Sequence, residues 1–267
     1  MPSDGFVLNR FIRGMDIVII GTGNAATILG RKLKKAGHRI LQVFGRDASA
    51  ASELAYMLGT ESTNYWSVVR KDADVYLIAV SDDAIQDVAK HLHVPDKVVA
   101  HTAGSVNQEV LKQSSPHYGV FYPLQSLHKD VNELPELSIV IDSSDEQTKK
   151  ILEQLAESIS DQTAILTEEN RLKLHVAAVI CNNFTNYLYT LAEEFCVKEN
   201  LNFALLYPLI QETAERVLQI SPSKSQTGPA IRHDQLTLHE HMAVLENYPE
   251  LRKVYEFLSD SIHLHKF

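Results

Sequence analysis

The segment Met15-Asp-Ile-Val-Ile-Ile-Gly21-Thr-Gly23-Asn-Ala-Ala26-Thr-Ile-Leu-Gly30 decides the fold of this chain. Its unbroken β-branched run, residues 17–20, is typical of a parallel strand buried on both faces. Gly21 can adopt the backbone angles of a sharp turn, and Gly23 lets a pyrophosphate approach the backbone. Ala26 stands at the third glycine position of G-x-G-x-x-G, a pattern that requires a strand before it and a helix after it. The segment therefore predicts a dinucleotide-binding turn, the alternative being a tight strand–helix turn that binds nothing.

Asn24 follows this turn directly. We expect its side chain to cap the next helix, whose free N–H groups and dipole favour an anion. Gly21, Gly23, Asn24 and Ala26 would then seat the pyrophosphate of the cofactor.

Composition limits the possible functions. The chain has 267 residues, 45% hydrophobic and 22% charged, as expected of a soluble globular protein. A net charge of -9 argues against non-specific nucleic-acid binding, which needs a basic face.

No apolar run approaches the ~20 residues of a membrane span, and the N-terminus lacks the apolar core of a signal peptide. Cys181 and Cys196 would lie about 22 Å apart on one helix, too far to bond, so we expect a cytoplasmic location.

Strands and helices alternate after an extension at residues 1–14. This alternation predicts a doubly wound parallel Rossmann sheet in an α/β domain at residues 15–167. The expected strands are 17–20, 39–44, 60–64, 74–80, 97–101, 118–121, 138–141 and 164–166. The expected helices between them are 24–36, 47–58, 82–93, 106–113 and 146–158.

The pattern changes after residue 167, where apolar residues recur at helical spacing. We expect an all-α C-terminal domain at residues 168–267, which would bind substrate and pair with a second copy in a homodimer. Its expected helices are 168–199, 203–219, 236–246 and 249–263.

The end of the second strand bears on the choice of cofactor. NAD sites place an acidic residue about 20 residues past the glycines, where it binds the ribose hydroxyls. Here Arg46 follows the strand tip, and a guanidinium suits a 2′-phosphate, so the sequence favours NADP over NAD. Arg46 could instead be an ordinary solvated side chain, and Asp47 could cap the next helix or keep NAD as an option.

Two loops follow strands at the edge where α/β sheets bind ligands. Val80 and Ser81 lie at the tip of the strand at 74–80 and are candidates to cover the cofactor, although capping of the next helix by Ser81 or Asp82 is favoured for those side chains. In the loop at 101–105, Thr102 is a candidate for the cofactor, and Gly104 and Ser105 are candidates for the substrate. His101 could act as an acid/base or hold this loop by hydrogen bonds.

A third loop, Tyr122-Pro-Leu-Gln125-Ser126, follows the strand at 118–121. Gln125 and Ser126 could face the substrate, but a structural role is favoured for this segment.

A polar line on an apolar helix is the sharpest functional signal. At 100° per residue, His175, Asn182 and Asn186 fall within about 40° of one another, with Asn183 at the margin. Buried polar groups need partners, so this line predicts either a helix–helix network or contacts with a bound polar substrate. We favour the substrate.

The loop at 226–234 is a second polar signal in the C-terminal half. Thr227 and Arg232 are candidate substrate contacts, because Arg232 could bind a carboxylate while Asp234 holds it in place. The alternative is a connecting loop with a surface ion pair. The C-terminal histidines do not combine with other ligands at metal-site spacing, so no metal is expected.

Several motifs together resemble a known family: GTGNAA, VSDDAI, HTAGS, YPLQS, HVAAVICNNF, TGPAIRHD and the late His241. This family of Rossmann-like proteins carries a C-terminal domain of unknown function, and its members are labelled NADP oxidoreductases. It is in turn similar to pyrroline-5-carboxylate reductases, deazaflavin-dependent NADP oxidoreductases and β-hydroxyacid dehydrogenases. The resemblance implies a Rossmann domain followed by a helical dimerisation domain.

The resemblance to β-hydroxyacid dehydrogenases also implies roles on the polar helix. Asn183 would match their catalytic asparagine, but Val179 stands where their lysine acid/base should be. His175, one turn earlier, could replace that lysine. The family is expected to have histidine more often where this chain has Tyr122.

These observations lead to a main hypothesis, an NADP-dependent oxidoreductase acting on a small polar ketone/alcohol or imine/amine pair. His175 would be the proton donor, Asn183 would orient the substrate, and His101 is the second choice as donor. The alternatives are a non-catalytic NADP(H)-binding sensor and a structural dimer with a vestigial glycine turn.

Overall fold

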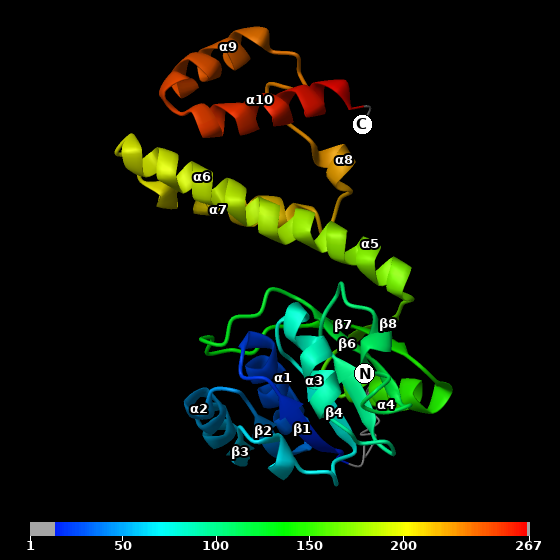
Figure 1. The fold of residues 1–267 in the computed structure, drawn as a ribbon. Coiled ribbons are helices and arrows are strands. Elements are labelled where there is room, and N and C mark those ends of the chain that lie inside the picture. The colour runs from blue at the N-terminus through cyan, green and yellow to red at the C-terminus, as the bar shows by residue number, and fades with distance from the viewer. Residues whose placement is uncertain (1–13, 266–267) are drawn as a thin grey trace, which may run out of the picture. The chain divides into compact units, whose positions relative to one another are not determined.

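The computed structural model describes residues 14–265 of the chain. Within them the chain forms two compact units, divided between Asn182 and Asn183. The first unit is an α/β sheet structure, and the second consists of helices (Figure 1).

The first unit contains an eight-stranded sheet with the order β3-β2-β1-β4-β5-β6-β7-β8. Strands β1 to β6 are parallel, which confirms the doubly wound Rossmann-like fold. The strands are β1 (Asp16–Ile20), β2 (Arg39–Phe44), β3 (Glu61–Thr63), β4 (Val75–Ile78), β5 (Val98–His101), β6 (Tyr118–Leu124), β7 (Ser138–Ser143) and β8 (Gln162–Ile165).

One edge of the sheet departs from the expected parallel arrangement. Strand β7 runs antiparallel to β6, and β8 is parallel to β7. A parallel neighbour needs a crossover, usually a helix, whereas residues 125–137 connect β6 to β7 without one. The chain therefore returns directly and reverses its direction.

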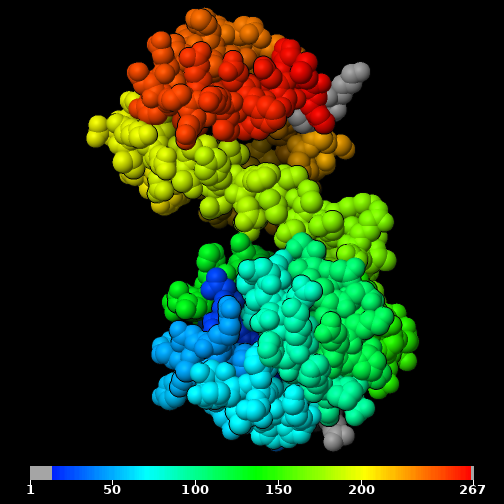
Figure 2. Space-filling model, in the orientation of Figure 1, coloured from blue at the N-terminus to red at the C-terminus, as the bar shows by residue number. Residues whose placement is uncertain are grey.

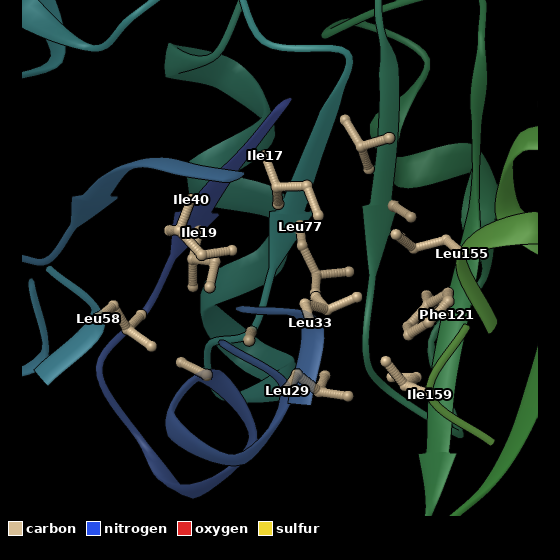
Figure 3. Packing of buried hydrophobic residues seen from close by; sticks show 14 of the residues in the cluster. Ile17, Ile19, Leu29, Leu33, Ile40, Leu58, Leu77, Phe121, Leu155 and Ile159 are labelled. Atoms are coloured by element: carbon tan, nitrogen blue, oxygen red, sulfur yellow. The ribbon is translucent and has the colours of Figure 1, made fainter. Parts of the chain in front are cut away.

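Helices cover both faces of the sheet. They are α1 (Asn24–Lys35), α2 (Ala48–Leu58), α3 (Ile85–His91) and α4 (Glu146–Glu157), with short 3₁₀ helices η1 (Trp66–Val68), η2 (Asp82–Ala84) and η3 (Gln108–Leu111). Strand β1 is buried on both sides, because Ile17 and Ile19 pack with α1, α2 and α4 (Figure 3), while Val18 and Ile20 pack with α3. The all-apolar strand predicted from residues 17–20 follows from this double burial.

The turn after β1 is shaped by a close approach between strands. Gly21 has a φ of +128°, and a Cβ added there would lie 2.1 Å from the carbonyl oxygen of Ala79. The Gly21 N–H donates to the Phe44 carbonyl at 2.8 Å. Gly21 therefore joins the ends of three strands where no side chain fits.

The start of α1 differs from the prediction at Asn24. The N-cap is Gly23, and Asn24 is already helical. The Asn24 side chain instead accepts a hydrogen bond from the Lys129 N–H at 3.1 Å. The expected capping role of Asn24 is therefore wrong, and its side chain holds the loop at residues 125–137 against α1.

The long helix predicted at 168–199 is present but interrupted. It consists of α5 (Glu168–Ala178), a π-helical segment (Val179–Phe184) and α6 (Thr185–Lys198). A π-helical turn holds more residues than an α-helical turn. The rotation of 100° per residue used for the polar line therefore does not hold across Val179–Phe184.

The remaining helices lie in the second unit, close to their predicted bounds. They are η5 (Phe203–Leu206), α7 (Tyr207–Arg216), α8 (Pro222–Ser225), α9 (Gln235–Val244), η6 (Leu245–Asn247) and α10 (Pro249–Leu264). The four-residue α8 lies between the predicted helices 203–219 and 236–246, where no helix was expected. Over residues 14–265, no helix is both long and apolar enough to cross a membrane.

We expect Gly21→Ala to lower the free energy of unfolding by about 3 kcal/mol, because it combines a positive φ with a backbone collision. Gly23→Ala is the matched control, since its added Cβ meets nothing within 4 Å. This control should change the free energy of unfolding by no more than ~1 kcal/mol. Urea denaturation of both variants measures the difference, and equal losses would contradict the close approach at Gly21.

Candidate functional site

A cavity of about 540 Å³ lies at the carboxyl ends of β1, β2 and β4. Strand order reverses here, because β1 has β2 on one side and β4 on the other. Open α/β sheets bind ligands at such a switch point. The cavity is lined by Gly21–Ala25, Phe44–Asp47, Trp66, Ala79–Ser81, Ala84, Asp87 and Val88.

The glycine turn leaves one wall of this cavity open to a ligand. Gly23 lines the cavity, and a Cβ added to it would lie in open space. It also caps α1 without a side chain, so the first N–H groups of α1 lack a side-chain acceptor there. An anion at this helix start would be favoured by those groups and by the helix dipole. A dinucleotide pyrophosphate therefore fits the turn, as the sequence predicts for Gly21, Gly23 and the buried Ala26.

The tip of β2 separates the two residues considered for cofactor choice. The Asp47 carboxylate accepts a hydrogen bond from the Ala50 N–H at 3.0 Å and caps α2. Arg46 lines the cavity, and it forms no ion pair with another residue in the described part of the chain. Its guanidinium is therefore available to an anionic group, whereas Asp47 is engaged by the helix.

A second cluster forms between β6 and α5, inside the first unit. The Tyr122 hydroxyl lies 2.9 Å from Nδ1 of His175, and the two rings meet edge to face. Gly104 packs against both, since a Cβ there would lie 2.8 Å from Tyr122 Cζ and 2.9 Å from His175 Nδ1. Burial, and secondarily the charge of Asp82, raise the pKa of Tyr122. Tyr122 therefore keeps its proton at neutral pH, next to a backbone with no side chain.

The loop after β5 is tied to the neighbouring strand ends. The Ser105 hydroxyl donates to the Asp82 carboxylate at 2.7 Å, which joins this loop to the tip after β4. The Thr102 N–H donates to the Ile78 carbonyl at 3.0 Å. Val80 and Ser81 line the cavity, whereas Thr102 is buried and does not line it.

His101 is fully buried in the sheet. Its Nδ1 accepts a hydrogen bond from the Ala103 N–H at 3.2 Å. Burial, assisted by the positive charge of Arg171, lowers the pKa of His101 to about 4. Nδ1 is therefore unprotonated and Nε2 carries the hydrogen, with no partner among the described residues. This geometry favours the loop-holding role for His101 over the acid/base role.

The other predicted substrate residues lie on exposed surface. Asn182, Asn183 and Asn186 are all exposed on the interrupted helix. Thr227 and Arg232 are exposed in the second unit.

The hypothesis that Asp234 holds Arg232 differs from what is observed. The Asp234 carboxylate caps α9, accepting from the Thr237 N–H at 3.1 Å and from the Thr237 hydroxyl at 2.8 Å. Among the ion pairs of residues 14–265, none joins Asp234 to Arg232. Nor do those residues contain three His, Cys, Asp or Glu side chains grouped closely enough to hold a metal ion.

Sequence reasoning missed Tyr122 as a partner of His175. It pointed instead to Gln125 and Ser126, which are exposed, and the Gln125 amide donates to the Glu136 carbonyl at 3.2 Å. The available signal was the position of Tyr122 at the end of a strand, at the same edge of the sheet as the loop at 101–105.

Comparison with known proteins identifies the family. A model described as NADP oxidoreductase coenzyme F420-dependent matches residues 16–104, and a domain of unknown function, DUF2520, matches residues 137–262. The solved structure of a putative NADP oxidoreductase from Bacteroides fragilis is 37% identical, covers 94% of this chain and 99% of its own, and has a TM-score of 0.87. The chain belongs to this NADP oxidoreductase family. The family resemblance stated from the sequence motifs is thereby confirmed.

More distant structures share the fold of this NADP oxidoreductase family member. A Thermotoga maritima protein is 24% identical over 91% of this chain and 99% of its own, with a TM-score of 0.74. The imine reductase from Myxococcus stipitatus, solved with NADP⁺, is 14% identical over 93% of this chain and 91% of its own, with a TM-score of 0.62. None of the curated proteins matches the chain.

We expect Arg46→Ala to weaken NADPH binding about 10- to 100-fold and to leave NADH binding nearly unchanged, because only NADPH carries a 2′-phosphate. Trp66 is the single tryptophan of the chain and lines the cavity, so its fluorescence reports binding directly. Lys90→Ala, which removes an exposed cation outside the cavity lining, is the control. Equal weakening of both nucleotides would show that Arg46 does not recognise the 2′-phosphate.

Proposed function

We propose that this chain is an NADP-dependent oxidoreductase that transfers a hydride to or from a small polar substrate, a ketone/alcohol or imine/amine pair. The observation that carries the proposal is the Tyr122–His175 pair, packed against the backbone of Gly104. NADP supplies the hydride chemistry when bound, and the protein supplies placement and protons. The loop that contains Gly104 follows β5, next to the strand whose tip lines the nucleotide cavity.

Reduction of a carbonyl or imine needs a proton on the oxygen or nitrogen as hydride reaches the carbon. The Tyr122 hydroxyl holds a proton at neutral pH, as an ordinary tyrosine does, and burial raises its pKa further. His175, 2.9 Å away and partly exposed, can relay a proton to Tyr122 after transfer: Nδ1 gives a proton to the phenolate while Nε2 takes one from water. We therefore assign His175 as proton donor through Tyr122, with His101 holding the loop.

The remaining predicted residues keep their proposed roles. Asn183 would orient the substrate. Val80, Ser81 and Thr102 would support the cofactor, as would Gly21, Gly23, Asn24, Ala26 and Arg46. Gly104, Ser105, Asn182, Asn186, Thr227 and Arg232 would contact substrate.

A non-catalytic NADP(H) sensor is the second candidate. It is favoured by Val179, which stands where the resemblance to β-hydroxyacid dehydrogenases implies a lysine. The two candidates separate on whether bound NADPH is oxidised by any member of a carbonyl and imine panel.

We also propose a homodimer in the cytoplasm, with residues 15–167 binding nucleotide and residues 168–267 binding substrate and the second copy. Large apolar side chains recur along α5, the π-helical segment and α6, whose surfaces reach the exterior (Figure 2). Val176 is 55% exposed, Phe184 59% and Tyr187 50%. Exposed apolar patches of this kind mark protein interfaces, and a second copy with the same stripe would cover them. Both cysteines are unpaired, in keeping with a reducing compartment.

We expect Tyr122→Phe and His175→Gln each to reduce turnover of an accepted substrate about 10²- to 10⁴-fold, because each removes one member of the proton path. NADPH affinity, followed by Trp66 fluorescence, should stay within about twofold, since neither residue lines the nucleotide cavity. Stopped-flow oxidation of NADPH over a panel of ketones and imines measures the change. His93→Gln, an exposed histidine elsewhere, is the control. Unchanged turnover in both variants would refute the assignment.

We expect wild type to sediment at twice the 30.0 kDa chain mass and the Val176→Glu/Phe184→Glu variant to sediment as a monomer. Charges placed in an apolar interface would lose their hydration without gaining partners. Tyr56→Glu, at a position 90% exposed on α2, is the control and should remain dimeric. A monomeric wild type at micromolar concentration would contradict the dimer.

A further inference from the structure

We propose that Arg171 is a positioning residue, which fixes the Tyr122–His175 pair by tying α5 to the loop after β5. The proposal rests on the proposed function in that this pair is taken to move the proton. The hydrogen bonds from Arg171 to this loop, however, are a property of the fold, and their effect on His175 can be measured without a substrate.

Arg171 is the largest fully buried side chain of the described residues, with 0% of its surface exposed. Its guanidinium makes three contacts with two other elements. Nε donates to the Gly104 carbonyl at 3.1 Å, Nη2 to the Val106 carbonyl at 2.8 Å, and Nη1 to the Asp142 carboxylate at 3.1 Å. One side chain of α5 therefore holds both the loop after β5 and strand β7.

The same helix carries His175, and the same loop packs against both members of the Tyr122–His175 pair. His175 lies four residues after Arg171, so the two side chains project from the same face of α5, one turn apart. Gly104, whose carbonyl accepts from Arg171, is also the residue that abuts Tyr122 and His175. A shift of the loop relative to α5 would therefore change the packing at Nδ1 of His175 directly.

The three acceptors explain why arginine is needed here. A guanidinium presents donors in a rigid planar fork, so Nε and both terminal nitrogens can each serve a different acceptor. A lysine would keep the charge opposite Asp142 but could not reproduce that fork. The Asn107–Glu168 hydrogen bond, 2.7 Å, is a second tie between this loop and α5, but it is exposed. Arg171 is thus the buried side chain that connects α5 to the loop after β5.

The test compares Arg171→Lys with wild type in three measurements. Histidine-labelled protein gives the ring-nitrogen NMR signals of His175, assigned by their loss in His175→Gln. We expect Arg171→Lys to change these signals while NADPH affinity, read from Trp66, stays within about twofold. With an accepted substrate, kcat should fall about 10- to 100-fold at a nearly constant KM, because small misplacements of reacting groups are costly.

Two further variants keep the proposal falsifiable. Lys173→Ala removes the exposed Lys173–Glu169 ion pair of the same helix and should leave the His175 signals unchanged. Arg171→Met removes all three donors without burying a new charge, and it serves if Arg171→Lys does not fold. A folded Arg171→Lys or Arg171→Met protein with unaltered His175 signals would overturn the positioning role. A wild-type enzyme that oxidises no NADPH would refute the proposed function, while the NMR comparison would still decide the positioning role.

Discussion

The close approach of Gly21 to the Ala79 carbonyl is the constraint on which the nucleotide cavity depends. Gly21 donates to Phe44, and the Ala79 N–H donates to the Ile20 carbonyl at 2.7 Å, so the ends of β2, β1 and β4 are held at one level. Residues after each of these ends then line the same cavity. A side chain at position 21 would push β1 from β4 and open the edge of the sheet where the cavity lies. The cavity is thus a consequence of backbone packing, and the side chains that line it determine which ligand it can bind.

The sequence predicts those features whose determinants lie within one short segment. The β-branched run at 17–20, the spaced glycines and the helical periodicity after residue 167 are each contained within one segment, and the structure contains the predicted elements close to their bounds. The direction of β7 could not be found in that way. Its buried centre, residues 139–141, is as apolar as that of the parallel strands, and its direction depends on a connection without a helix. Asn24 shows the same limit, because its side chain found a partner 105 residues away in place of the local cap.

The candidate site was only partly visible in the sequence, for a related reason. His175 was conspicuous as a polar residue on an apolar helix, but its partner Tyr122 lies 53 residues earlier in a strand where tyrosine is common. Arg171, within Glu-Asn-Arg-Leu-Lys, has the sequence surroundings of a solvated side chain, yet it is buried by contacts with residues 29 to 67 positions away. The polar line of Asn182 and Asn186 assumed regular α-helical rotation, which the π-helical segment interrupts. Long-range partners and a local change of helix type both lie outside what residue spacing encodes.

The buried charge of Arg171 bears on the choice between an enzyme and a sensor. A buried ion pair such as Arg171–Asp142 is weak evidence for stability, because apolar residues of similar volume often stabilise a protein as well or better. What the guanidinium supplies that apolar residues cannot is directional hydrogen bonding to the loop at Gly104 and Val106. The cavity proposed to bind nucleotide lies at the ends of β1, β2 and β4. Its lining includes neither Gly104 nor His175, which contact each other. In the proposed function this contact places the Tyr122–His175 pair, and that placement is needed for proton transfer but not for nucleotide sensing.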